Sequence, residues 1–181
     1  MAHFNVLNKE MDAFRHLLSP KQKFAWTPEL EAEFERSKEN IVKLVANGVA
    51  IFEPNETTIL NTDWSEVGIG YWLYQKTCKC PFDPNPNKCC DSGWRVTSAN
   101  SRAIRPAKRN YWPTEGEALG VAWALNDSKF FTMGCSDLHV TTDHRPLITL
   151  LGNKDLADID NRSLASFKER TFPWDFQIHY V

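Results

Sequence analysis

The sequence of 181 residues lacks an excess of basic residues and lacks long apolar runs, and each absence excludes a class of protein. Its 21 Lys and Arg and 23 Asp and Glu give a net charge of −2, so a phosphate-binding role needs local basic residues, a metal ion or a neighbouring domain. No apolar run reaches the roughly 18 residues of a membrane span. The N-terminal MAHFNVLNKE also lacks the apolar core of a signal peptide. We therefore expect an intracellular protein, cytoplasmic or nuclear, with no membrane partner.

The composition favours one globular domain with a helical segment in front of it. An apolar content of 42%, with seven Trp and eleven Phe, supplies enough area for a core. Thr27 is a good helix N-cap and Pro28 suits the first helical position, and Leu30 and Phe34 follow on one face of that helix. We predict a helical tether over residues 1–53 and an α/β domain over residues 54–181.

The domain is organised around residues 57–75, which predict two antiparallel strands joined by a short connection at an acidic turn. Alternation places Ile59, Asn61 and Asp63 on one face of the first strand. Further strands and helices are predicted at 94–99, 113–131, 138–143, 146–151, 161–170 and 176–180. Three strands, a buried helix, a strand, short helices and a last strand predict an α/β fold with a mixed sheet.

Three acids lie at the ends of predicted elements and are expected to converge. Asp63 lies near the end of the first strand, Glu117 in the first turn of the buried helix, and Asp143 at the end of the fourth strand. Such a cluster is repulsive unless divalent cations neutralise it, and oxygen ligands favour Mg²⁺ or Mn²⁺. Two ions together could activate a water and stabilise the leaving oxygen of a phosphodiester.

Each acid also has a structural interpretation. Glu117 lies three residues after Thr114, which is the spacing of a capping box. Asp143 could cap the turn that follows it, and Asp63 could be a turn aspartate. The pattern alone leaves these alternatives open.

Longer segments carry a resemblance to a known family. They are ILNTDWSEVGIGYWLYQ, SRAIRPAKRNYWPTEGEALGVAWAL and LHVTTDHRPLITLL, preceded by FAWTPELEAEFERSKENI. In this order they resemble the ribonuclease H region of Ty3/gypsy-type retrotransposon reverse transcriptases and the tether before it. The resemblance implies a ribonuclease H-like mixed five-stranded sheet with flanking helices. It also implies that Asp63, Glu117 and Asp143 are the first three catalytic, metal-binding acids.

The resemblance further implies a substrate and a partner. It implies Mg²⁺- or Mn²⁺-dependent cleavage of the RNA strand of an RNA–DNA hybrid, beside the polymerase domain of the same polyprotein. Members of this family continue past the last strand into a helix that carries a fourth acid, and this sequence stops before that helix, at Val181. The alternative hypothesis is therefore an inactive structural or connection module that only docks on polymerase or nucleic acid.

Polar and basic residues near the three acids are candidates for substrate contact, because a hybrid is recognised through phosphates and 2′-hydroxyls. They are Asn61, Ser65, Arg102, His144 and Arg145. The alternative for each basic residue is a solvated, salt-bridged surface.

A loop rich in Pro and Cys follows the central hairpin and reads CKCPFDPNPNKCCDSGW. Cys78, Cys80, Cys89 and Cys90 offer four thiolates, the number that a tetrahedral zinc site needs. Their spacing differs from the usual pairs separated by two residues. A zinc site, a reduced loop and a disulfide all remain open, although a reducing compartment disfavours the disulfide.

Overall fold

The computed structural model describes residues 14, 17, 24–48, 50–90, 93–104 and 110–181 of the chain. The chain forms two compact units, Met1–Val49 and Ala50–Val181. Among the described residues, no helix is both long enough and apolar enough to cross a membrane.

The first unit contains helix α2, Pro28–Gly48, at the position that the sequence predicts. Thr27 begins it, because its carbonyl accepts a hydrogen bond from the Glu31 N–H at 3.0 Å and its hydroxyl lies 3.4 Å from the Leu30 nitrogen. The ring of Trp26 stacks near that of Phe14 and meets Phe34 of α2 edge-on, with centroids 6.0 and 5.8 Å apart. These aromatic contacts hold the chain before α2 against the helix.

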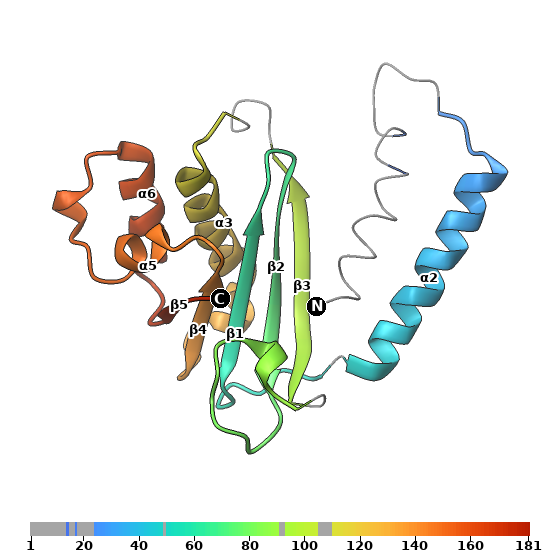
Figure 1. Cartoon of the computed structure of the whole chain (residues 1–181), viewed down its shortest axis with the longest axis horizontal. Coiled ribbons are helices and arrows are strands. Elements are labelled where there is room, and N and C mark those ends of the chain that lie inside the picture. Colours follow the sequence, from blue (N-terminus) through green and yellow to red (C-terminus); the bar gives the residue numbers. More distant parts are fainter. Residues whose placement is uncertain (1–13, 15–16, 18–23, 49, 91–92, 105–109) are drawn as a thin grey trace. The chain divides into compact units, whose positions relative to one another are not determined.

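The second unit is built on a five-stranded sheet in the order β3-β2-β1-β4-β5 (Figure 1). The strands are β1 (Thr58–Trp64), β2 (Gly68–Lys76), β3 (Trp94–Ala103), β4 (Leu138–Thr142) and β5 (Gln177–Tyr180). Strands β1, β2 and β3 pair antiparallel, whereas β4 is parallel to β1 and to β5. The predicted mixed five-stranded sheet is confirmed.

Helices complete the second unit and supply about half of its buried core cluster. They are α3 (Pro113–Asp127), α4 (Lys129–Thr132), α5 (Pro146–Leu151) and α6 (Arg162–Thr171), with single 3₁₀ turns η2 (Pro86–Lys88) and η4 (Leu156–Asp158). Helix α3 packs against β1 and β2 and contacts α5 and α6. Its residues Ala118, Val121 and Leu125 are fully buried, as expected of a helix that is apolar nearly all round.

Two differences from the sequence prediction are larger than one residue. The helix expected over 113–131 is divided into α3 and α4 at Ser128, whose hydroxyl donates to the Ala124 carbonyl at 2.7 Å. This side-chain bond competes with the backbone ladder. Strand β3 extends to Ala103 rather than ending at residue 99, because β2 continues to pair with it as far as Gly68.

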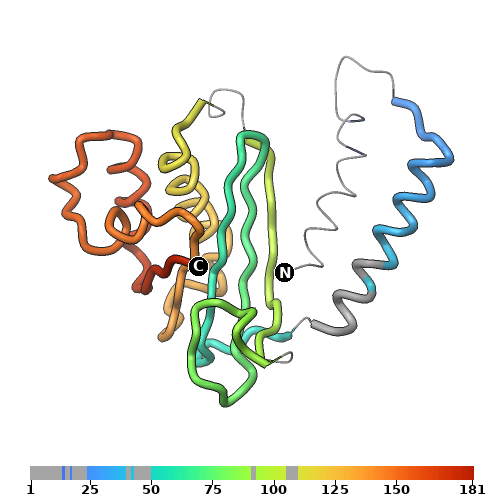
Figure 2. The backbone as a smooth tube through the Cα atoms, in the orientation of Figure 1, coloured from blue at the N-terminus to red at the C-terminus, as the bar shows by residue number. Residues whose placement is uncertain are grey.

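The two faces of the sheet are covered by different parts of the chain. Leu60 and Trp64 pack in the core on the side of α3, which we call the helix face. Ile59 and Asp63 alternate with them and therefore lie on the other side, the opposite face. The connection between β2 and β3 is the long green loop at the lower end of the sheet in Figure 2.

A candidate active site at the ends of β1 and β4

Asp63 and Asp143 meet because two neighbouring strands run in the same direction. Strand β1 is parallel to β4, and Asn61 of β1 is paired with Thr141 of β4. Asp63 and Asp143 each lie two residues beyond that pair, at the same edge of the sheet. Both residues are exposed to solvent, so this edge offers two accessible carboxylates.

Glu117 reaches the same edge from α3, and a close contact between the helix and the strand positions it. A Cβ atom built on Gly116 would lie 2.2 Å from the ring of Trp64, so only glycine allows α3 to approach β1 this closely. Trp64 follows Asp63 directly, and Glu117 follows Gly116 directly. The contact therefore brings Glu117 to the end of β1, where the charge of Asp63 acts on it.

The electrostatics of the three acids show that they interact. Burial raises the pKa of Glu117 to about 8, with further contributions from Asp143 and then Asp63, while the backbone N–H of Trp64 offsets part of the rise. The pKa of Asp63 is also raised, first by desolvation and then by the charge of Asp143. Asp143 thus disfavours the ionised forms of Asp63 and Glu117, and Asp63 disfavours that of Glu117.

The donor set fits a hard divalent cation. Glu117 is 6% exposed, and its Oε2 is buried without a hydrogen-bond partner among the residues that the structure describes. An unpaired buried carboxylate oxygen is costly. A cation with a preference for oxygen ligands would satisfy this oxygen and neutralise the repulsion between the three acids.

The capping-box interpretation of Glu117 is wrong. Helix α3 begins at Pro113, so Trp112 is its N-cap and Glu115 is the third helical residue. A carboxylate oxygen of Glu115 accepts a hydrogen bond from the Trp112 N–H at 3.2 Å, and the other accepts one from Asn161 at 3.0 Å. Glu115 therefore caps the helix, and the carboxylate of Glu117 is left for the site.

Thr114 holds His144 beside the acids, whereas the sequence suggested only a capping role for Thr114. The hydroxyl of Thr114 lies 2.8 Å from Nε2 of His144, and the His144 N–H donates to the hydroxyl of Thr142 at 3.1 Å. His144 follows Asp143 directly, so its half-buried ring is fixed next to the acid cluster. The sequence analysis also did not identify Gly116 as a residue that positions the site. A glycine in the first turn of a helix is a signal for close packing.

The two uncharged candidates for substrate contact already make hydrogen bonds within the fold. The amide nitrogen of Asn61 donates to the hydroxyl of Thr141 at 2.9 Å, which links β1 to β4. The Ser65 hydroxyl donates to the Gly68 carbonyl at 3.0 Å and accepts from the Gly68 N–H at 3.1 Å, within the β1–β2 turn. Both residues flank Asp63 in sequence, and their contact with substrate stays a prediction.

The two arginines lie in different surroundings. The guanidinium of Arg102 lies over the ring of Trp123 in α3, 5.2 Å from its centroid, so it is held on the helix face. Arg145 is exposed at the start of α5 and lines a pocket with Pro84, Ile178 and His179. The nearby basic residues Arg105, Lys108 and Arg109 lie outside the described residues.

The four cysteines of the β2–β3 connection are brought together at the other end of the sheet. Their sulfur atoms all lie within 4.8 Å of one another.

A family model decides where the chain belongs. The model described as "RNase H-like domain found in reverse transcriptase" matches residues 53–169, which is more than half of the chain. The chain belongs to this family. Asp63, Glu117 and Asp143 all lie within the matched residues of this reverse-transcriptase RNase H-like domain, and the resemblance predicted from the sequence is confirmed.

Relatives and solved structures agree with the RNase H-like assignment. The chain is 30% identical over 80 residues to the retrovirus-related Pol polyprotein from transposon opus of Drosophila melanogaster, and 28% identical over 96 residues to that from transposon gypsy. These matches cover 44% and 53% of the chain but only 8% of each polyprotein.

The fold resembles that of a viral enzyme at low sequence identity. The protease-reverse transcriptase of prototype foamy virus superposes with a TM-score of 0.55 and 13% identity, over 96% of this chain and 21% of that one. The foamy viral protease-reverse transcriptase in complex with an RNA/DNA hybrid gives a TM-score of 0.56 and 12% identity, over 95% and 22%. The likeness shows a shared fold.

Proposed function

We propose that this chain is the ribonuclease H domain of a retroelement polyprotein and hydrolyses the RNA strand of RNA–DNA hybrids in a metal-dependent, endonucleolytic reaction. The observation that carries the proposal is the convergence of Asp63, Glu117 and Asp143. These residues couple electrostatically at one edge of the sheet, and a buried oxygen of Glu117 has no partner among the described groups.

Asp63, Glu117 and Asp143 would hold the metal ions. Two Mg²⁺ or Mn²⁺ ions would neutralise the carboxylates, activate the attacking water and stabilise the leaving oxygen of the phosphodiester. The protein residues contribute position and charge. Glu117 is fixed by the packing of α3 on Trp64, whereas Asp63 and Asp143 are exposed where a nucleic-acid backbone can approach.

The proposed substrate is an RNA–DNA hybrid, and the proposed partner is the polymerase domain of the same polyprotein. The structure of a foamy viral protease-reverse transcriptase with an RNA/DNA hybrid supports both proposals by analogy of fold. His144 is positioned by Thr114 beside Asp143 and is a candidate for a contact with the hybrid's backbone. Such contacts need little base-specific chemistry.

Cleavage of a labelled RNA–DNA hybrid by the 181-residue chain tests the proposal. We expect cutting of the RNA strand in Mg²⁺ or Mn²⁺ and none in chelator. Asp63→Asn and Glu117→Gln should each lower the rate by at least about 100-fold, because each removes a charged metal ligand. Glu115→Gln is the matched control and should keep activity, because Glu115 binds Trp112 and Asn161 instead of the site.

Two further substrates sharpen the test. Single-stranded RNA and double-stranded DNA of the same sequence should stay intact, because the proposal requires the hybrid. Binding of the hybrid without cleavage in either metal would contradict the proposal, and so would cleavage that survives Asp63→Asn.

A further inference from the structure

The sulfur atoms of four cysteines converge at the base of the β2–β3 connection. Cys78 and Cys80 follow the end of β2, and Cys89 and Cys90 precede β3. Because β2 and β3 are paired to their ends, with Lys76 opposite Trp94, the two cysteine pairs leave the sheet side by side. All four Sγ atoms lie within 4.8 Å of one another.

The distances between these sulfur atoms match metal coordination better than disulfides. The Sγ atoms of Cys78 and Cys89 are 3.3 Å apart, and those of Cys80 and Cys90 are 3.9 Å apart. A disulfide needs about 2.05 Å. A tetrahedron of thiolates with Zn–S bonds of about 2.3 Å has edges of about 3.8 Å. The 3.9 Å distance matches that edge, and the 3.3 Å distance is nearer to it than to the length of a disulfide.

The backbone around the cluster leaves room for sulfur and little else. A Cβ atom on Gly93 would lie 2.4 Å from the Sγ of Cys89 and 3.2 Å from that of Cys78. Glycine is therefore required where the chain returns to β3. The Thr77 N–H donates to the Gly93 carbonyl at 2.9 Å, and the Gly93 N–H donates to the Cys90 carbonyl at 2.8 Å. These bonds close the two ends of the connection around the sulfur atoms.

A lysine supplies the positive charge that such a cluster needs. Lys76 Nζ donates to the carbonyl oxygen of Cys78 at 2.7 Å and to that of Cys80, and it lies 3.5 Å from the Sγ of Cys78. Four thiolates around one divalent cation carry a net charge of −2. An ammonium group hydrogen-bonded at their edge offsets part of that charge.

We propose that Cys78, Cys80, Cys89 and Cys90 bind one zinc ion with tetrahedral geometry. Four soft thiolate ligands select zinc over Mg²⁺ or Mn²⁺, and four protein ligands leave no position open for catalysis. The ion is therefore structural, and it is distinct from the oxygen-bound metals proposed at Asp63, Glu117 and Asp143.

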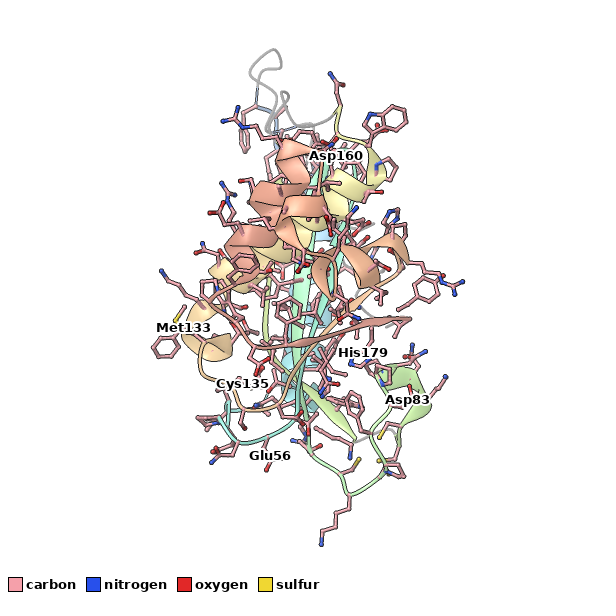
Figure 3. The ribbon with its side chains drawn as sticks, turned by 90° about the vertical axis from the view of Figure 1, so that its left-hand side faces the viewer. Glu56, Asp83, Met133, Cys135, Asp160 and His179 are labelled. Carbon is pink, nitrogen blue, oxygen red and sulfur yellow. The ribbon has the colours of Figure 1, made fainter. Side chains whose placement is uncertain are left out.

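The zinc ion would fix a loop that covers part of the opposite face. Phe82, between the two cysteine pairs, stacks on His139 of β4 with ring centroids 4.1 Å apart, and it meets the edge of Trp94 at 6.3 Å. Ile59, which is paired with His139, is completely buried there. Figure 3 shows Asp83 and His179 on the same side of the sheet, with Met133 on the other side.

The site lies far along β1 from the acids, so metal binding at the two sites can be separated. Lys76 and the cysteines lie beyond the start of β1, because Thr58 is paired with Gln75. Asp63 lies near the other end of the strand, paired with Gly70. Loss of zinc should therefore lower the stability of the loop without removing a ligand of the catalytic metals.

The metal content of the untagged 181-residue chain, purified under reducing conditions without chelator, tests the proposal. We expect one zinc per chain by elemental mass spectrometry. Cys78→Ser and Cys89→Ser should lose most of this zinc. Cys135→Ser is the matched control and should keep it, because Cys135 is buried elsewhere in the fold and is not part of the cluster.

Replacement of zinc by cobalt gives a readout that needs no variant. The unmodified chain with one equivalent of Co²⁺ should show the thiolate-to-metal charge-transfer and ligand-field absorption of tetrahedral sulfur coordination. Metal removal should also lower the Tm. A chain with no bound zinc and no such cobalt spectrum would overturn the proposal. Two disulfides found by mass spectrometry in protein kept under reducing conditions would overturn it as well.

Discussion

Glu117 is a buried acid whose charge the protein itself does not compensate, and this makes the metal-free protein sensitive to pH. Its pKa is raised from 4.5 to about 8, chiefly by burial. The folded state therefore binds a proton more tightly than the unfolded state, and stability falls as the pH rises between these two values. The resulting loss in the free energy of unfolding is limited to roughly 2–5 kcal/mol, since one pKa unit corresponds to about 1.36 kcal/mol.

Thermal unfolding in chelator at pH 5 and pH 8 measures this dependence. We expect a lower Tm at pH 8 for the unmodified chain, a smaller difference for Glu117→Gln, and recovery of the Tm at pH 8 on addition of Mg²⁺, which binds the ionised form. An equal pH dependence in Glu117→Gln and the unmodified chain would show that Glu117 does not carry this penalty.

Two glycines of α3 provide a matched pair for the contact that positions Glu117. A Cβ on Gly116 would lie 2.2 Å from the ring of Trp64, whereas a Cβ on Gly120 would lie 3.9 Å from the Cβ of Trp64. We expect Gly116→Ala to cost about 1–3 kcal/mol through overpacking. Gly120→Ala should be neutral or stabilising by up to about 1 kcal/mol, because alanine favours helix.

Denaturant unfolding of both variants, with hybrid cleavage measured alongside, decides whether this contact matters. Gly116→Ala should also lower activity, since the helix must shift and carry Glu117 with it. If both alanine variants were equally stable and active, the close approach of α3 to β1 would be unnecessary for the site.

At the scale of elements, the strands and the buried helix could be predicted because their signals are local. Alternation placed Asp63 near a strand end, and Pro113 marked the start of α3. Spacing alone could not identify the N-cap of α3. Thr114 with Glu117 and Trp112 with Glu115 are both separated by the three residues of a capping box. The helix begins at Pro113, two residues earlier than a Thr114 N-cap would require, and this determines which carboxylate is free.

The cysteine cluster shows a second limit of sequence analysis. Spacing alone left zinc, free thiols and a disulfide open for Cys78, Cys80, Cys89 and Cys90. The convergence of their sulfur atoms depends on the pairing of β2 with β3 and on the turns within the connection. The spacing of the cysteines predicts neither the strand register nor those turns.

Helix α6 holds the segment after α5 through one buried lysine. Lys168 Nζ donates to the carbonyls of Leu150 at 3.0 Å, Gly152 at 3.3 Å and Lys154. Lys168→Met would leave these acceptors without their cation, and we expect a loss of about 2–4 kcal/mol. The exposed side chain of Lys154 gives the control, because Lys154→Met should change stability by less than about 0.5 kcal/mol.

Chemical denaturation of the two lysine variants distinguishes a structural cation from a surface charge. The informative quantity is the difference in the free energy of unfolding between Lys168→Met and Lys154→Met, because both changes remove one positive charge. Equal stabilities would mean that water replaces the ammonium group at the three carbonyls.

At the scale of the whole molecule, the core that the described residues form in the RNase H-like domain lies within the second unit. The buried core cluster and the side chains packed on it all lie between Phe52 and Ile178, and the family match begins at residue 53. The tether expected over residues 1–53 stays a prediction, and the second compact unit begins at Ala50.

Because the core cluster of the described residues lies between Phe52 and Ile178, we expect a chain of residues 50–181 to fold by itself. We expect cooperative thermal unfolding, followed by near-ultraviolet circular dichroism, with a Tm within a few degrees of that of the full chain. The shorter chain should also retain the pH dependence that Glu117 causes, since all three acids lie within it. A non-cooperative transition, or a loss of the near-ultraviolet signal, would mean that residues 1–49 contribute to the stability of the sheet.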